Sequence, residues 1–142
     1  MGRCLRDAGA TFHYHNHDYE LEDLGGGTTA MDLLLGELDD TAVDLCVDVG
    51  LGARGGRDPA AFLAEHGERI GYLYLKDCQC EPGKTGREGL IWRELGNGVV
   101  DWDAVMEVVL GLEHVEWVLV EQDRTDCEPG ESLRISRAFL QR

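Results

Sequence analysis

Lysine is nearly missing from this chain, and acidic residues far outnumber basic ones. Only Lys76 and Lys84 are lysines, and 13 lysine and arginine residues stand against 28 aspartate and glutamate residues in a total of 142, a net charge of −15. A protein that holds a nucleic acid by its phosphates needs a basic surface, so the composition argues against a nucleic-acid partner. Repulsion between like charges instead favours solubility.

Long hydrophobic runs are also missing. No stretch approaches the roughly 18 consecutive apolar residues of a membrane-spanning helix, and the first residues, MGRCLRDAG, are too polar for a secretory signal. The cysteines are odd in number and scattered, and the pair closest together has only one residue between its members, which is poor zinc spacing. We therefore expect reduced thiols in a cytoplasmic protein without a membrane partner.

What the chain does have is a regular alternation of strand and helix signals. A hydrophobic content of 43% is enough for one domain with a core. Apolar and β-branched runs predict strands at 10–17, 43–49, 70–75 and 115–120. Helical spacing and capping residues predict helices at 28–38, 58–66, 101–110 and 129–140, after a first helical segment at 1–8. Such alternation predicts parallel strands with right-handed crossovers.

Three local signals support these helices. Thr28 or Thr29 can cap the first of them, Asp58 followed by Pro59 opens the second, and Asp101 caps the third. In the last helix we expect the inward positions to be Leu133, Ile135, Phe139 and Leu140. Between the third strand and the third helix lies a long polar loop, 78–98, and loops of that length inside a domain are usually functional or mobile.

The stretch TFHYHNHDYE places three histidines on alternate residues. If 10–17 is a strand, His13, His15 and His17 share one face. Two interpretations are open at this point: a solvated or mutually hydrogen-bonded cluster, or a set of ligands, since buried imidazoles need partners. Polar residues also end the other strands, and ligands of parallel sheets bind at that edge. These residues are Asp48, Lys76, Asp77 and Glu121, of which Asp77 is also explained as an ordinary loop residue.

Seven collinear pieces of the sequence resemble the sugar phosphate isomerase/epimerase superfamily, the xylose isomerase-like TIM barrels, and most of all its inosose dehydratase-like branch. They are YHNHDYE (14–20), DLCVDVG (44–50), DPAAFL (58–63), RIGYLYLKD (69–77), ELGNGVVDW (94–102), VEWVLVEQD (115–123) and ESLRIS (131–136). Each piece is weak alone, but together they cover nearly the whole chain in family order. The resemblance implies an α/β fold of four strand–helix units, the second half of a (β/α)8 barrel, as a single domain over 1–142.

The resemblance also implies a divalent metal, manganese, cobalt or zinc, held at successive strand ends by a Glu, an Asp, a His and a Glu. Asp48 and Glu121 stand at the Asp and the last Glu positions. His15 stands at the first Glu position, because the family's Glu-Asn-His motif aligns with residues 15–17. Tyr74 stands where the family's HLKD motif has its histidine, and a phenol with a pKa near about 10 is a poor ligand at neutral pH. We therefore expect His15, Asp48 and Glu121 as metal ligands, with His13 or His17 as a substitute.

The implied function is a metal-dependent isomerase, epimerase or dehydratase that acts on a sugar or keto-polyol through an enediolate. Glu121 is expected to be ligand and base, or ligand alone. Lys76 is expected to stabilise the oxyanion, or to form a salt bridge with Asp77 or Asp48. A third option is a nucleic-acid end-processing enzyme of the same superfamily, but the acidic surface argues against it.

Three more residues are expected to contact the substrate. His17 and Glu20 can bind sugar hydroxyls, with plain surface solvation as the alternative. Trp92, in the long loop, can stack on a sugar face or can simply fasten the loop to the barrel.

The competing function is a degenerate or truncated half-barrel that binds a ligand or assembles without catalysis. TIM barrels need eight strands and about 250 residues, whereas this chain offers four units. A half-barrel leaves two strand edges open. A fragment of a longer product, a split gene or a half-barrel that pairs with its own copy are all compatible with the sequence, and the helix-like start favours truncation. We expect either a homo-oligomer or a missing N-terminal half-barrel as partner.

Overall fold

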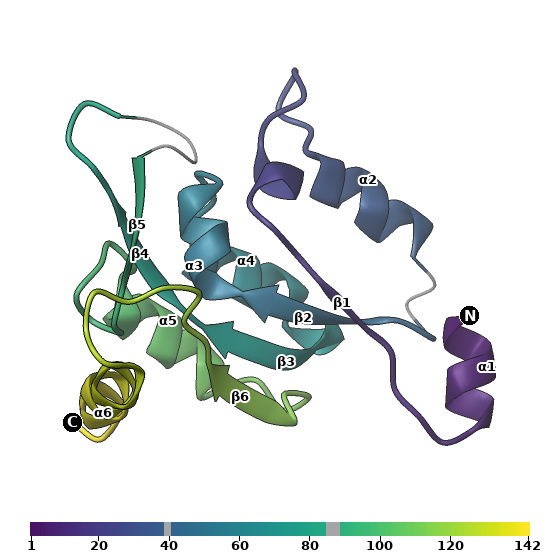
Figure 1. Cartoon of the computed structure of the whole chain (residues 1–142). Helices are drawn as coiled ribbons and strands as arrows, with labels where there is room; N and C mark the ends of the chain where they lie inside the picture. The colour runs from purple at the N-terminus through teal and green to yellow at the C-terminus, as the bar shows by residue number, and fades with distance from the viewer. Residues whose placement is uncertain (39–40, 85–88) are drawn as a thin grey trace.

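The computed structural model describes residues 1–38, 41–84 and 89–142, and within them a parallel four-stranded sheet (Figure 1). The strand order is β1-β2-β3-β6, and each neighbouring pair is parallel. The strands are β1 (His13–His15), β2 (Asp44–Asp48), β3 (Ile70–Leu75) and β6 (Trp117–Val120). This confirms the expected α/β architecture of TIM-barrel type, at the length of half a barrel.

The helices follow the strands in the expected alternation. They are α1 (Gly2–Asp7), α2 (Ala30–Glu37), α3 (Val49–Arg54), α4 (Pro59–His66), α5 (Trp102–Val109) and α6 (Pro129–Leu140), with the 3-10 turns η1 (Tyr19–Leu21) and η2 (Gly67–Arg69). Thr29, Asp58 and Asp101 each cap a helix through the side-chain oxygen, which confirms the capping predictions. No helix of the described residues is long and apolar enough to cross a bilayer.

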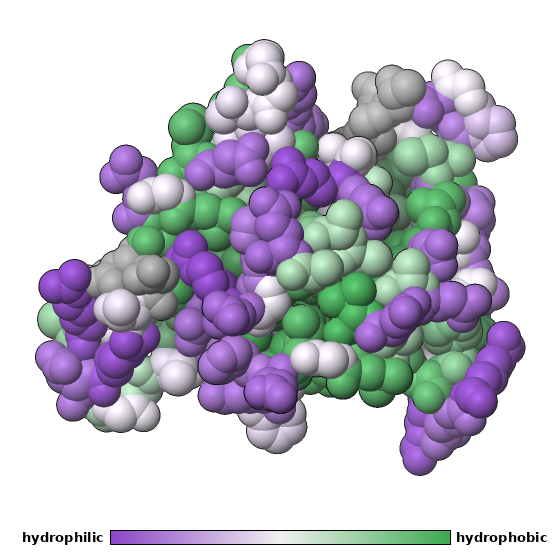
Figure 2. Space-filling model, turned by 180° about the vertical axis from the view of Figure 1, so that it is seen from behind, coloured by the Kyte–Doolittle hydropathy of each residue, from purple (hydrophilic) through white to green (hydrophobic). Residues whose placement is uncertain are grey.

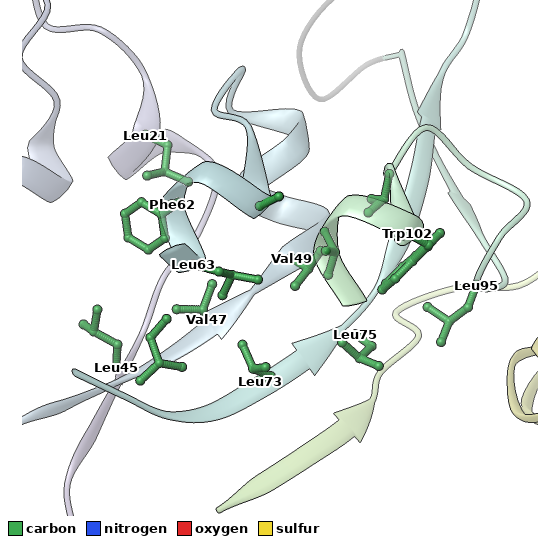
Figure 3. Close-up of a cluster of buried hydrophobic side chains, with 14 of the residues drawn as sticks. Leu21, Leu45, Val47, Val49, Phe62, Leu63, Leu73, Leu75, Leu95 and Trp102 are labelled. Atoms are coloured by element: carbon green, nitrogen blue, oxygen red, sulfur yellow. The ribbon is translucent and has the colours of Figure 1, made fainter. Parts of the chain in front are cut away.

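The hydrophobic core lies between the two central strands and the helices packed on one face of the sheet (Figure 3). Leu45 and Val47 of β2 and Leu73 and Leu75 of β3 point to this face. Across from them lie Phe62 and Leu63 of α4 and Trp102 and Val105 of α5. Because side chains alternate along a strand, the residues between them, Cys46, Asp48, Tyr72 and Tyr74, belong to the opposite face.

Two strand predictions need correction. The first strand was expected over 10–17, but only His13–His15 pair with β2, and the chain then turns into η1. The loop 78–98 was expected to lack regular structure. It contains an antiparallel hairpin of β4 (Asp77–Cys80) and β5 (Leu90–Arg93), and its residues 85–88 lie outside the described part. The helix α3 was also missed: the Asp48 side chain accepts a 2.9 Å hydrogen bond from the Leu51 N–H and starts a helix directly after β2.

The inward face of α6 was predicted wrongly in part. Leu133 and Leu140 are 54% and 41% exposed, whereas Ser132 and Ser136 are buried. The reason is that α6 packs on the segment after β5: the Ser132 hydroxyl donates to Glu94 and the Ser136 hydroxyl accepts from the Leu95 N–H. Polar contacts therefore fix the rotation of this helix.

Asp77 is a buried structural residue, not an ordinary loop residue. Its side chain is fully buried and accepts hydrogen bonds from five donors. They are the backbone N–H groups of Cys78, Gly96, Gly98 and Val100 and the Trp102 indole N–H, at 2.8–3.3 Å. One carboxylate thus ties the end of β3 to the turn at 96–100 and to the start of α5.

Polar and apolar surfaces are unevenly distributed. From behind the view of Figure 1, apolar residues form a broad area in the middle of the molecule, with polar residues around and between them (Figure 2). The two chain ends lie on opposite sides of the molecule (Figure 1).

Candidate active site

The carboxyl ends of the parallel strands bring three potential ligands together. His15 ends β1, Asp48 ends β2 and Glu121 follows β6 directly. One ligand atom of each side chain lies within 4.8 Å of the other two, and His15 Nε2 is 3.6 Å from Asp48 Oδ2. The set expected from the sequence therefore converges, although neighbouring strands contribute only two of its members.

These three side chains meet at buried polar atoms. His15 Nε2, Asp48 Oδ2 and Glu121 Oε2 are closed off from solvent. His15 Nε2 forms no hydrogen bond with a described residue, whereas the two carboxylate oxygens face the Lys76 ammonium. One ammonium stands against the three carboxylates of Asp48, Glu121 and Asp123, so negative charge is in excess beside an imidazole nitrogen without a hydrogen bond. Buried charge and buried polar atoms need compensation, so their convergence indicates a site for a cation that the chain itself does not supply. One imidazole and two carboxylates are a donor set that suits zinc, manganese or cobalt.

Lys76 shares this site. Its ammonium Nζ lies 2.9 Å from Asp48 Oδ2 and 3.3 Å from both Glu121 Oε2 and Asp123 Oδ2. Burial lowers the pKa of Lys76, but the carboxylates of Asp48, Glu121 and Asp123 together raise it above its usual value, so the side chain stays charged. The sequence allowed Lys76 to pair with Asp77 or Asp48, and the structure shows the pair with Asp48.

Tyr74 lies beside the cluster without joining it. Its ring contacts the His15 ring edge-on, with centroids 4.9 Å apart. The pKa of its phenol is raised by the neighbouring Cys46, by burial and by Glu121 and Asp48, against a smaller opposite effect of Lys76. A phenol that holds its proton is a poor metal ligand. Cys46 is likewise inert, because burial and the charges of Asp48 and Glu121 raise the pKa of its thiol to about 11.

The three histidines separate instead of forming one group. His13 stacks on Tyr72, with centroids 4.3 Å apart, and lies 3.9 Å from Asp44. His15 belongs to the ligand cluster, and the ring of His17 stacks on it at 5.4 Å. Within the described residues, neither His13 nor His17 joins the group of potential ligands.

An open cleft of about 400 Å³ lies next to the ligand cluster. It is lined by His17, Asp18, Leu51, Leu90, Trp92, Asp123 and Arg124. The Lys76 ammonium lies over the Trp92 ring, 4.9 Å from its centroid, so this indole forms part of the cleft and also packs against the charged centre. Two residues expected to contact substrate, His17 and Trp92, therefore do line a cleft. A larger hollow lies elsewhere, around 64–69 and 111–114, away from these groups.

Glu20 does not line the cleft. Its side chain is buried and accepts hydrogen bonds from the Tyr14 hydroxyl and from the His17 N–H. Burial and the bond to Glu20 raise the pKa of Tyr14. Both oxygens of Glu20 thus hold β1 and the following turn in place, which positions His17.

Sequence reasoning missed several residues of the site. Asn16 is buried and accepts a 2.8 Å hydrogen bond from the Asp48 N–H, which fastens the end of β1 to the end of β2. Asp123 pairs with Lys76, and Arg124 lines the cleft. Asn16 could have been noticed, because it lies between His15 and His17 in the histidine stretch. Asp123 and Arg124 had only their position after a strand, which many loop residues share.

The chain is similar in sequence to proteins of known name. No family model matches the chain. It is 27% identical over 155 aligned residues to an inosose dehydratase of Clostridium beijerinckii, and 26% identical over 156 to that of Halalkalibacterium halodurans. These alignments cover 99% of this chain but only 50% and 49% of the two relatives. The chain thus spans about half the length of the curated proteins that it matches.

Solved structures show the same proportion. A sugar phosphate isomerase/epimerase of Parabacteroides distasonis superposes with a TM-score of 0.73 at 23% identity, over 99% of this chain and 48% of that one. A probable 3-DHS dehydratase of Bacillus anthracis gives 0.72 at 16% identity, over 99% and 53%. A xylose isomerase domain protein of Planctomyces limnophilus gives 0.71 at 15% identity. In sequence and in fold the chain therefore resembles one half of a barrel of the xylose isomerase-like sugar phosphate isomerase/epimerase superfamily.

Proposed function

We propose that this chain is the metal-holding half of a sugar or keto-polyol isomerase, epimerase or dehydratase that works through an enediolate. The observation that carries the proposal is the convergence of His15, Asp48 and Glu121 at buried atoms, where the two carboxylates share one ammonium, that of Lys76. Relatives named as inosose dehydratase and neighbours named as sugar phosphate isomerase/epimerase support the choice of substrate class.

His15, Asp48 and Glu121 would hold a divalent cation, which supplies Lewis acidity toward a carbonyl or a diol. Glu121 is the carboxylate best placed to act as base, because it is half-exposed while Asp48 is fully buried and caps α3. It takes the proton from the carbon next to the carbonyl, and the electron pair moves to the carbonyl oxygen. In isomerisation, the proton returns to the former carbonyl carbon while the α-hydroxyl proton moves to the other oxygen. In epimerisation, a proton returns to the opposite face of the same carbon, and in dehydration the β-hydroxyl takes up a proton and leaves as water.

Lys76 stabilises the negative charge that develops on the oxygen, because its ammonium is fixed among the same carboxylates and stays protonated. The cleft beside it offers an indole face at Trp92 and an imidazole at His17. A ring or chain of hydroxylated carbons fits this mixture of apolar face and polar edge.

The test combines metal analysis with isotope exchange. After dialysis against Mn²⁺, Co²⁺ or Zn²⁺, about one ion per chain is expected by elemental analysis. Incubation with an inosose in D2O should then exchange the hydrogen next to the carbonyl, which NMR detects whichever product forms. Absence of both bound metal and exchange, with the chain folded and at every oligomeric state sampled, would contradict the proposal.

A second candidate function is a half-barrel that binds ligand without turnover. The observation that favours it is Tyr74, which occupies a ligand position of the family with a protonated phenol beside the cluster. Stoichiometric metal without hydrogen exchange would support this alternative.

A further inference from the structure

Strand β6 forms one outer edge of the sheet and leaves its apolar side chains uncovered. Trp117, Val118 and Leu119 are 60%, 46% and 39% exposed. In the order β1-β2-β3-β6, the opposite edge is β1, and neither strand pairs on its outer side within the described part of the chain. A parallel sheet is normally buried on both faces and at its edges, so this surface is suited to pairing with another strand.

The exposed area of the whole chain leads to the same surface. The solvent-accessible area is 8476 Å² for a chain of 15.7 kDa. A compact monomer of this mass is expected to expose about 7,300 Å². The excess, about 1,200 Å², exceeds the roughly 800 Å² that each partner contributes to a standard protein interface.

We propose that the sheet edges β1 and β6 form the interface with a second copy of this chain, which closes an eight-stranded barrel. A two-fold axis along the barrel places β6 beside β1 of the second copy, and β1 beside its β6. All strands then remain parallel, both edges are satisfied by one symmetric contact, and four strands from each copy give the eight that a (β/α)8 barrel requires. The neighbours that superpose on this chain use only about half of their own residues to do so.

The two edges carry different polar side chains. β1 carries His13 and His15, whereas Glu116 and Glu121 flank β6. Closure brings β1 of one copy beside β6 of the other, where Trp117 is 60% exposed in the single chain. The second copy also covers the side of the ligand cluster on which Glu121 lies, so the interface bears on the site as well as on the fold.

The net charge of the chain opposes this contact, so the affinity of the dimer should depend on salt. Each chain carries −15, so two copies repel at low ionic strength. Salt screens this repulsion, with a Debye length of about 30 Å at 0.01 M and about 3 Å at 1 M. The dimer should therefore tighten as salt is added.

Sedimentation velocity of the 142-residue chain, from 1 to 100 µM in 0.05 and 1 M NaCl, tests the proposal. A species of twice 15.7 kDa is expected, with no larger ones and with a lower dissociation constant in high salt. Trp117→Arg should raise that constant at least tenfold. The matched control is Leu110→Arg, which places the same charge on an apolar residue that is 84% exposed at the end of α5. It should leave the constant unchanged.

A monomer throughout, an open series of larger oligomers, or equal effects of both substitutions would overturn the proposal. Hydrogen exchange on the unsubstituted chain gives a second answer if a variant fails to fold. Amides of β1 and β6 should become protected as concentration rises, and protection that ignores concentration would count against the interface. This result is independent of the proposed chemistry, because mass and exchange are measured without substrate or metal.

Discussion

Lys76 Nζ and Asp48 Oδ2 are 2.9 Å apart, and both side chains are almost completely closed off from solvent. A buried ion pair gains little over an apolar pair, but removal of one partner leaves a charge without compensation. This relationship makes the site sensitive to the charge at position 76, because a second cation in the cluster competes with the ammonium for the same oxygen.

The substitution Lys76→Met is expected to lower the free energy of unfolding by about 3 kcal/mol in the presence of chelator. Added Zn²⁺ or Mn²⁺ should restore much of this loss, because the metal meets no ammonium beside Asp48 and Glu121. Urea unfolding with and without metal measures both effects. Lys84→Met is the control, since Lys84 is the other lysine and pairs with Glu81 on the surface. Equal losses in the two variants would show that the buried pair has no special weight.

Asp48→Asn separates the two roles of this residue. The amide oxygen can still accept from the Leu51 N–H and cap α3, but Oδ2 loses its charge. Metal affinity, measured by calorimetry, should fall by more than the roughly 10–100-fold that outer-shell changes cost. The control Asp58→Asn changes a capping aspartate of α4 in the same way, at a residue outside the ligand group. Unchanged affinity in Asp48→Asn would remove Asp48 from the site.

Tyr74→His is expected to tighten the binding of Zn²⁺ or Co²⁺ at least tenfold. The Tyr74 ring already contacts His15, and an imidazole there would add a fourth ligand to His15, Asp48 and Glu121. Tyr74→Phe removes the hydroxyl alone and should leave the affinity as it is. If both variants bind metal as the unsubstituted chain does, a side chain at 74 does not reach the site.

Glu94 makes stability depend on pH at the acid end. Burial acts to raise its pKa, but hydrogen bonds from Thr125, from its own backbone N–H, from Ser132 and from Cys127 prevail and lower it. A carboxyl whose pKa is lower in the folded state stabilises the fold above its unfolded pKa of about 4.3. This contribution disappears as the pH falls through the folded value.

The stability difference between the unsubstituted chain and Glu94→Gln should therefore be about 1–3 kcal/mol at pH 7 and should shrink below about pH 4. Denaturant unfolding of both chains from pH 7 to pH 3 measures this difference. The pH dependence that the other carboxylates contribute is common to both chains and cancels in the difference. Glu128→Gln serves as control, because that carboxylate is exposed, caps α6 and otherwise pairs only loosely with the exposed Arg134 side chain. A difference that stays constant to pH 3 would contradict the assignment.

The elements that sequence predicts well are those with local signals. The strand 70–75 and the helix 129–140 match the structure residue for residue, and caps at Thr29, Asp58 and Asp101 each act within one turn. Convergence of His15, Asp48 and Glu121 was also predictable, because parallel strands end at one edge. Their chemical role remains a proposal.

Features that depend on distant contacts were not predictable. The rotation of α6 follows from bonds between its serines and residues 94–95, forty positions earlier. The hairpin of β4 and β5 lies in a stretch whose glycines and polar residues indicate a loop. Glu20 was expected to contact substrate or solvent, and Asp77 to lie at a strand end or in an ordinary loop, because charged side chains are usually exposed. Each is buried because backbone donors or a tyrosine hydroxyl surround its carboxylate.

The five hydrogen bonds of Asp77 lead to the last prediction. Asp77→Ala leaves buried N–H groups at 78, 96, 98, 100 and 102 without an acceptor, and the free energy of unfolding should fall by at least about 3 kcal/mol. Asp77→Asn keeps one oxygen and the volume, so it should lose less. The near-ultraviolet circular dichroism of Trp102 should change in both variants, because its indole N–H loses a charged partner.

Metal affinity per folded molecule separates this structural role from a chemical one. Asp77 makes no contact with His15, Asp48 or Glu121 among the described interactions, so calorimetry below the melting temperature should return the unsubstituted value for Asp77→Asn. Fully retained stability together with lost metal binding would reverse the assignment. Asp77 would then belong to the metal site.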